Sequence, residues 1–109
     1  MNITSKFIIF GGKLLFDPTC AYHRELVPKN TAKYQRVAGG GVITIDNENG
    51  KIIIEGESYD FGMASPDAVR MIFRKDHEDI INTLEMINET RGETDDLKNY
   101  KIYIYGKEV

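Results

Sequence analysis

The chain is poor in cysteine and in long apolar runs. Cys20 is its one cysteine, so an internal disulfide is excluded and a reducing compartment is favoured. The apolar runs are only a few residues long, far below the ~20 residues that a membrane-spanning helix needs. The first residues also lack the basic start and the apolar stretch of a signal peptide. We therefore expect a cytoplasmic protein that does not enter a membrane.

A clustered basic surface is not indicated either, because 14 basic residues face 17 acidic ones. The net charge is −3, and the lysines and arginines are scattered instead of being interleaved with aromatic residues. This distribution argues against a nucleic-acid-binding groove. The length of 109 residues suits one hydrophobic core, and no linker, repeat or low-complexity tract divides the chain. We expect a single domain over residues 1–109.

Apolar segments alternate with turn residues in the first half of the chain. Residues 7–10 and 14–16 flank Gly11-Gly12, which predicts a hairpin. Both segments are apolar on both faces, so we expect both strands inside a sheet that is covered on each side. A short helix is expected from about residue 17 to about residue 26, and Pro28 stops it.

The remaining elements complete a mixed pattern. Residues 34–38 can form a strand, and residues 42–46 and 51–55 predict a second hairpin. Ser65-Pro66-Asp67 is a strong helix start, and a second helix is expected from Asp76 to before Gly92. A polar loop over residues 93–98 and a strand around residues 102–104 follow. This order predicts an α/β or α+β fold with a mixed sheet flanked by helices.

The segment around Ser58 is the first candidate site. It joins the second hairpin to the helix that begins at Ser65, so free backbone amides and a helix N-terminus are expected near one another. Such a loop is a natural place for an anion. Gly39-Gly40-Gly41, at the entrance of the hairpin, lacks the lysine of a nucleotide-binding loop, so we interpret it as a bulge or a close approach of another backbone.

His23 is the second candidate. It lies near the start of the short helix, and a histidine can accept or donate a proton near neutral pH. On the residues alone, a surface or half-buried histidine without a role is the favoured interpretation. Cys20 and His23 are too few ligands for a metal, and no third group is present in the sequence to activate them as a nucleophilic pair. His77, between two acidic residues, is expected to be a surface residue.

Several segments, in order, resemble the phosphohistidine phosphatase (janus/ocnus) family, and the match is good over about residues 22–73. The similar positions are Ser5-Lys6-Phe7, Ala21-Tyr22-His23-x-Glu25-Leu26, Gly39-Gly40-Gly41 and Gly56-x-Ser58-x-x-Phe61-Gly62. The resemblance implies a six-stranded mixed sheet with helices on both faces. It also implies metal-independent removal of phosphate from phosphohistidine in a protein or from a small phosphoramidate, without a cofactor, by a monomer or weak homodimer.

The resemblance assigns roles to individual residues. His23 is implied to be the general base, and Lys6, Ser58, Tyr59 and Asp60 to bind the phosphoryl group. Gly39, Gly40, Gly41 and Gly62 are implied to be structural glycines near this site, and no metal ligand is implied. Whether water attacks the phosphorus directly or His23 is phosphorylated first stays open.

The sequence departs from the family at three positions, which makes it a divergent member. Val42 and Leu15 stand where arginines are expected, and Asp60 replaces a small residue in the anion loop, where a carboxylate repels phosphate. Arg24 or Lys13 are the candidates for compensation. Two alternatives follow: a non-catalytic module that binds a phosphorylated or anionic ligand, and a site in which Asp60 recruits a metal or a cationic substrate.

Overall fold

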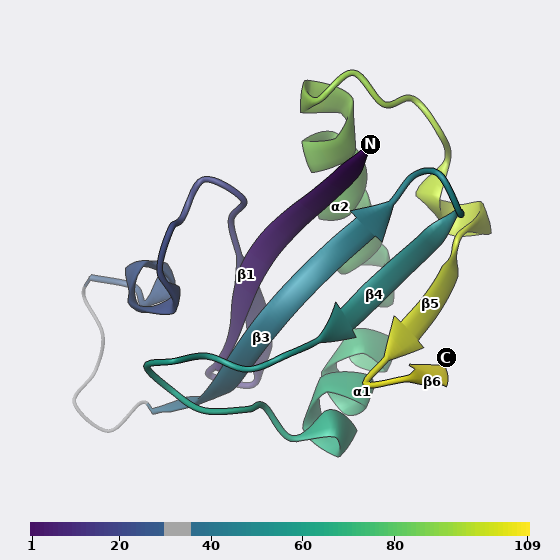
Figure 1. Ribbon diagram of the computed structural model, residues 1–109. Coiled ribbons are helices and arrows are strands. Elements are labelled where there is room, and N and C mark those ends of the chain that lie inside the picture. Colours follow the sequence, from purple (N-terminus) through teal and green to yellow (C-terminus); the bar gives the residue numbers. More distant parts are fainter. Residues whose placement is uncertain (30–35) are drawn as a thin grey trace.

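The computed structural model describes residues 1–29 and 36–109, which form a curved mixed sheet with helices packed on it (Figure 1). The sheet has six strands in the order β2-β1-β3-β4-β5-β6. Their bounds are β1 Asn2–Phe10, β2 Lys13–Phe16, β3 Val37–Asp46, β4 Lys51–Glu55, β5 Lys101–Ile104 and β6 Lys107–Glu108. Only the β4–β5 pair is parallel among these neighbours. The predicted six-stranded mixed sheet in one domain-sized α+β unit is confirmed.

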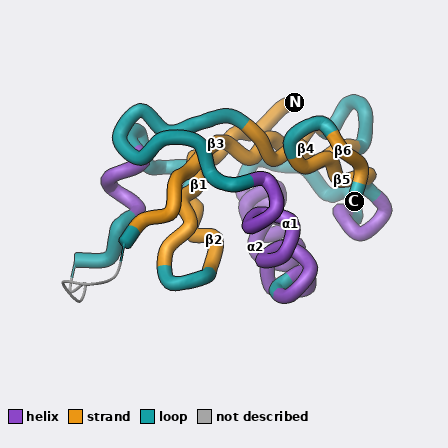
Figure 2. Tube along the Cα trace, turned by 90° about the horizontal axis from the view of Figure 1, so that it is seen from below, coloured by secondary structure: helices purple, strands orange, loops and turns teal. Residues whose placement is uncertain are grey.

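Helices lie on both faces, as predicted, but unequally. The two α-helices, α1 (Pro66–Lys75) and α2 (His77–Thr90), pack together on one face (Figure 2). Because Phe7 and Ile9 point to that face, they enter one apolar core with the buried residues of both helices. The 3-10 helix η1 (His23–Leu26) packs at the opposite face, over the start of β3. A second 3-10 helix, η2 (Leu97–Asn99), precedes β5.

Local chemistry explains most of these elements. Gly11 and Gly12 both have positive φ and turn β1 into β2. The Ser65 hydroxyl accepts a hydrogen bond from the Ala68 amide, and Pro66 begins α1, as the sequence predicts. Asp76 lies between the two helices, at the predicted boundary.

Three local predictions are corrected. β1 lies inside the sheet, but β2 is an edge strand, because its apolar residues cover the faces of the sheet and do not require a second neighbouring strand. The short helix is confined to η1. Within the predicted polar loop 93–98, Leu97 is fully buried in η2. The predicted strand 34–38 is seen from Val37 onward, and residues 34 and 35 lie outside the described residues.

Candidate active site

The glycine run at the start of β3 lets a neighbouring loop lie directly against the strand. The Gly40 amide donates to the Gly62 carbonyl at 3.0 Å, and the Ala64 amide donates to the Gly40 carbonyl at 3.2 Å. A Cβ at Gly39 would lie 2.7 Å from the Ala64 Cα, and Gly39 itself has a φ of 87°. The predicted close approach of another backbone is therefore present, and it fixes the loop after β4 beside the sheet.

The same glycines make room for His23. A Cβ on Gly40 would lie 3.1 Å from the His23 ring, so a larger residue would compress the imidazole. The His23 Nε2 lies 2.8 Å from the Gly41 carbonyl oxygen, and the side chain is only 6% exposed. Because a carbonyl only accepts, this contact places the proton on Nε2 and leaves Nδ1 with the lone pair. The backbone of β3 thus selects the tautomer in which Nδ1 is the basic atom.

The start of η1 is held by Glu25. Its Oε1 accepts hydrogen bonds from the amides of Ala21 at 3.0 Å and Tyr22 at 2.8 Å. This contact satisfies amides at the beginning of the short helix and fixes the direction in which the chain enters it. His23 is therefore oriented from both sides, by the Glu25 cap along the chain and by the Gly41 carbonyl across it.

The loop that contains Ser58 is a tight turn closed by its own backbone. Ser58 and Gly62 exchange two backbone hydrogen bonds, of 3.1 and 2.8 Å. The Phe61 amide donates to the Ser58 hydroxyl oxygen at 3.1 Å. The amides of Tyr59 and Asp60 at the tip have no acceptor among residues 1–29 and 36–109. They are the donors that this loop can offer to an anion.

A cleft of about 400 Å³ gathers most of the predicted site. Lys6, His23, Tyr59 and Asp60 line it. Ser58 does not: its side chain is buried and supports the turn behind the cleft. Sequence reasoning did not place Tyr22 and Glu57 in the site, yet both line the cleft together with Arg24. The sequence could have indicated both residues by their position, because Tyr22 directly precedes His23 and Glu57 directly precedes Ser58.

Lys6 reaches the cleft from the middle of β1. It pairs with Val42 across the sheet and lies on the same side of the strand as Ile8, opposite Phe7 and its core. No acceptor for its ammonium group lies among the residues that the structure describes. An anion in the cleft can therefore pair with Lys6 without displacing an existing salt bridge.

Arg24 adds a second cation beside the unexpected carboxylate. Its guanidinium lies 3.9 Å from an Asp60 carboxylate oxygen and 4.3 Å from the centre of the Tyr22 ring. An ion pair this long, with Arg24 mostly exposed, contributes little to stability and leaves the guanidinium free to turn toward an anion. Lys13, the other candidate for compensation, lines a different cavity. Arg24 is thus the one of the two that is placed to balance Asp60.

The cysteine lies apart from this cleft. Cys20 lines the cavity that also contains Lys13. Burial, followed by the nearby carboxylates of Asp17 and Glu25, raises the pKa of the Cys20 thiol, which keeps it protonated. Over residues 1–29 and 36–109, no three side chains of His, Cys, Asp or Glu come together as a metal site would require. No described helix is long and apolar enough to span a bilayer.

The fold and the cleft together define a class of protein. It is a small α+β protein in which a histidine, a lysine and a loop with free backbone amides line one cleft beside the sheet. A family model described as the Janus/Ocnus family matches residues 5–81, well over half of the chain. The chain belongs to this family. No curated protein matches the chain. No solved structure matches it either.

Proposed function

We propose that the protein is a phosphatase that hydrolyses the P–N bond of phosphohistidine or a related phosphoramidate. The observation that carries the proposal is the shared cleft of His23, Lys6 and the Tyr59–Asp60 tip, with the tautomer of His23 set by the Gly41 carbonyl. Membership of the Janus/Ocnus family supports it. The phosphorylated protein or small phosphoramidate would enter from solvent on the side of Tyr59, which is fully exposed.

The chemistry follows from these positions. Lys6, Arg24 and the two free amides would hold the phosphoryl oxygens, whose charge grows in the transition state. His23 Nδ1 would take a proton from the attacking water as the new P–O bond forms. The P–N bond would break with its electron pair moving to the substrate nitrogen, which takes up a proton. A removed donor of this kind commonly costs ~2.7–4 kcal/mol of transition-state stabilisation.

The alternative within this mechanism is attack by His23 Nδ1 itself on phosphorus. That route passes through a phosphorylated His23, which water then hydrolyses. Rapid quenching followed by intact-mass measurement separates the two routes, because only the second adds a phosphoryl group to the protein during turnover.

The test compares the two histidines of the chain. Phosphate release from phosphohistidine is measured for the wild type, for His23→Ala and for His77→Ala, which removes the exposed histidine at the start of α2. Loss of the base should lower the rate on the order of 10²–10⁴-fold, whereas His77→Ala should keep the wild-type rate. Near-background release by all three proteins would exclude the phosphatase.

A non-catalytic module is the second candidate, and the carboxylates in the cleft favour it. Glu57 and Asp60 line the same cleft as Lys6 and Arg24, so positive and negative charges balance there. Such a site would hold a phosphorylated ligand without strongly stabilising added negative charge in a transition state. Measurable binding of a phosphorylated peptide, with no phosphate release by the wild type, is the result expected for this candidate.

A further inference from the structure

The outer edge of β2 is open. β2 (Lys13–Phe16) ends the sheet, and alternate residues of an antiparallel edge strand point their amides and carbonyls away from the neighbouring strand. No hydrogen bond from that edge to another described residue is present within residues 1–29 and 36–109. An unpaired strand edge is a template for a further strand. Here one such edge borders a cavity.

The cavity measures about 430 Å³ and lies between β2, the segment leading into η1, and the start of α2. Its floor is apolar, with Leu15, Leu26 and Ile80. Its rim is acidic, with four carboxylates: Asp17, Glu25, Asp76 and Asp79. Lys13 is the single cation among the described lining residues. We call this cavity and the adjoining β2 edge the β2 groove.

The carboxylates of the β2 groove come from three elements on both sides of the open strand. Asp17 follows β2, Glu25 belongs to η1, Asp76 lies between α1 and α2, and Asp79 belongs to the first turn of α2. Hydrogen bonds from the hydroxyl and the amide of Thr19 lower the pKa of Asp17, so its charge persists at neutral pH. These groups are not gathered closely enough to hold a metal ion. Their spread suits several positive charges along an extended ligand.

We propose that the β2 groove binds an extended, basic segment of a partner protein, which adds to the sheet beside β2. Main-chain hydrogen bonds to the strand edge would supply affinity, and the acidic rim would select lysine and arginine. Apolar side chains of the segment would cover Leu15 and Leu26. A second copy of this chain is a poor occupant, because two such acidic rims would repel each other across the contact.

The β2 groove shares a wall with the cleft. In η1, His23 and Arg24 line the cleft, whereas Glu25 and Leu26 line the β2 groove. A polypeptide held beside β2 and crossing η1 would therefore present a neighbouring residue to His23. This second part rests on the proposed function: it makes a phosphorylated residue within a basic segment the preferred protein substrate.

The binding test uses an unphosphorylated peptide in which lysine and valine alternate, and a matched peptide with glutamate in place of lysine. The lysine peptide should shift the amide resonances of residues 13–16 and slow their hydrogen exchange, and its affinity should fall as salt is raised. The glutamate peptide should do neither. Equal binding of both peptides, or shifts confined to other residues, would overturn the proposal, as would a peptide-independent dimer formed through β2.

The variant test separates the rim from general charge effects. Asp76→Lys with Asp79→Lys should weaken binding of the lysine peptide at least tenfold. Asp76→Asn with Asp79→Asn is the milder pair, to be used if charge reversal disturbs α2, and it should weaken binding several-fold. Glu48→Lys with Glu89→Lys makes the same charge change at exposed sites outside the groove and should leave affinity unchanged. Equal losses in the two lysine double variants would reject a specific rim.

The two proposals fail separately. Peptide binding measured with His23→Ala reports on the β2 groove alone, and release of phosphate from free phosphohistidine reports on the cleft alone. If the groove acts as proposed, the Asp76→Asn, Asp79→Asn variant should keep its rate on free phosphohistidine and lose rate only on a basic phosphopeptide. A matching loss on both substrates would show that these residues act on the cleft and not on a bound segment.

Discussion

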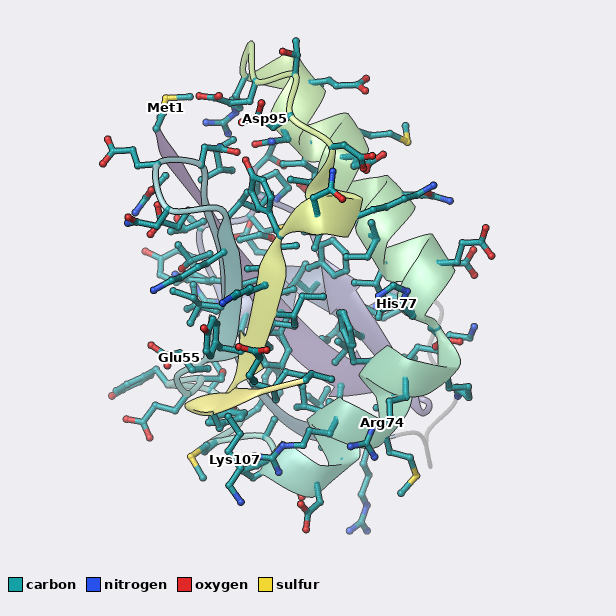
Figure 3. All side chains as sticks on the ribbon, turned by 90° about the vertical axis from the view of Figure 1, so that its right-hand side faces the viewer. Met1, Glu55, Arg74, His77, Asp95 and Lys107 are labelled. Atoms are coloured by element: carbon teal, nitrogen blue, oxygen red, sulfur yellow. The ribbon has the colours of Figure 1, made fainter. Side chains whose placement is uncertain are left out.

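The two ends of β3 differ in how their polar groups are hydrogen-bonded. At its far end, Asn47 and Asn88 exchange amide hydrogen bonds of 2.9 and 3.0 Å, and the Tyr100 hydroxyl donates to Asn47 at 2.8 Å. Figure 3 shows Met1 and Asp95 at this end of the molecule, and both take part: the Met1 carbonyl accepts from Asn47, and an Asp95 carboxylate oxygen, 3.1 Å from the Tyr100 hydroxyl, is the second acceptor that shares its proton. Every one of these groups has a partner within the protein.

At its glycine-bearing start, the strand leaves polar groups uncommitted. Lys6 and the amides of Tyr59 and Asp60 have no partner among the described residues, and the ring of His23 is bonded through Nε2 only. Leaving donors unpaired is costly unless water or a ligand meets them. The far end of β3 thus holds a network closed within the protein, whereas the glycine-bearing start leaves around the cleft the donors that the proposed function would use to hold an anion.

The largest loss of stability is expected when a glycine of the run Gly39 to Gly41 is replaced by alanine. A Cβ at Gly41 would lie 2.4 Å from the Glu55 carbonyl oxygen and 2.8 Å from the Phe7 ring, so Gly41→Ala must displace backbone or core. We expect the free energy of unfolding, measured in urea, to fall by about 3 kcal/mol. Gly62→Ala is the control: it meets strain from its positive φ but no atom within 4 Å, and about 1 kcal/mol is expected. Equal losses would show that the close packing at Gly41 is unimportant.

Substitutions at the far end of β3, where Asn47 and Asn88 pair, should change stability and not activity. Asn88→Ala would remove both hydrogen bonds that its side chain exchanges with Asn47, and it would do so at a position that is almost completely buried. We expect a loss of about 2 kcal/mol in the free energy of unfolding, with an unchanged rate of phosphate release. Asn82→Ala, at an exposed position of the same helix, should change neither quantity. A clear loss of activity in folded Asn88→Ala would break the division between the two ends.

Tyr100 makes the paired end sensitive to alkaline pH. Burial, helped by the hydrogen bond to Asp95 and by nearby carboxylates, raises the pKa of Tyr100 from its ordinary value of 10.0 to about 12. The neutral phenol is favoured in the folded state, so its contribution is complete below about pH 10 and is lost as the pH rises toward 12.

Tyr100→Phe is expected to cost about 1 kcal/mol at neutral pH, because it removes the hydroxyl from Asn47 and Asp95. Between about pH 10 and 12 the wild type should lose more stability than Tyr100→Phe does. Urea unfolding across this range measures both effects. Tyr103→Phe, which removes a hydroxyl that donates to the exposed Glu108, is the control. Parallel pH profiles for wild type and Tyr100→Phe would contradict the assignment.

The sequence predicts those features of the fold and of the candidate site that depend on local chemistry. Gly11-Gly12 indicates the first turn, Ser65-Pro66 indicates the start of α1, and Gly39 to Gly41 indicate a close backbone approach; all three are confirmed. Each is a constraint that a residue imposes on its own backbone or its immediate contact, so it can be read without knowing the rest of the fold.

The parts that depend on long-range placement could not be predicted. Apolar residues on both faces of β2 do not reveal that its outer edge is open, since face burial and strand pairing are separate properties. The burial of Leu97 depends on where η2 docks. Ser58 is a plausible phosphate donor by residue type, yet its hydroxyl accepts from Phe61 inside the turn. Only the folded loop shows which amides stay free.

The smallest change in the free energy of unfolding is expected from Asp60→Asn, whose main effect should be on the affinity for an anion. Its pair with Arg24 is long and partly exposed, so Asp60→Asn should change the free energy of unfolding by less than about 1 kcal/mol. The substitution removes a negative charge from the cleft and frees Arg24 for an anion. Titration calorimetry with inorganic phosphate should show affinity raised about threefold to tenfold, in line with a screened repulsion of ~1 kcal/mol. Asp67→Asn, outside the cleft, should leave the affinity unchanged. Weaker phosphate binding by Asp60→Asn would mean that the carboxylate positions Arg24 for the anion, and that the two charges at the unpaired end of β3 work together instead of opposing each other.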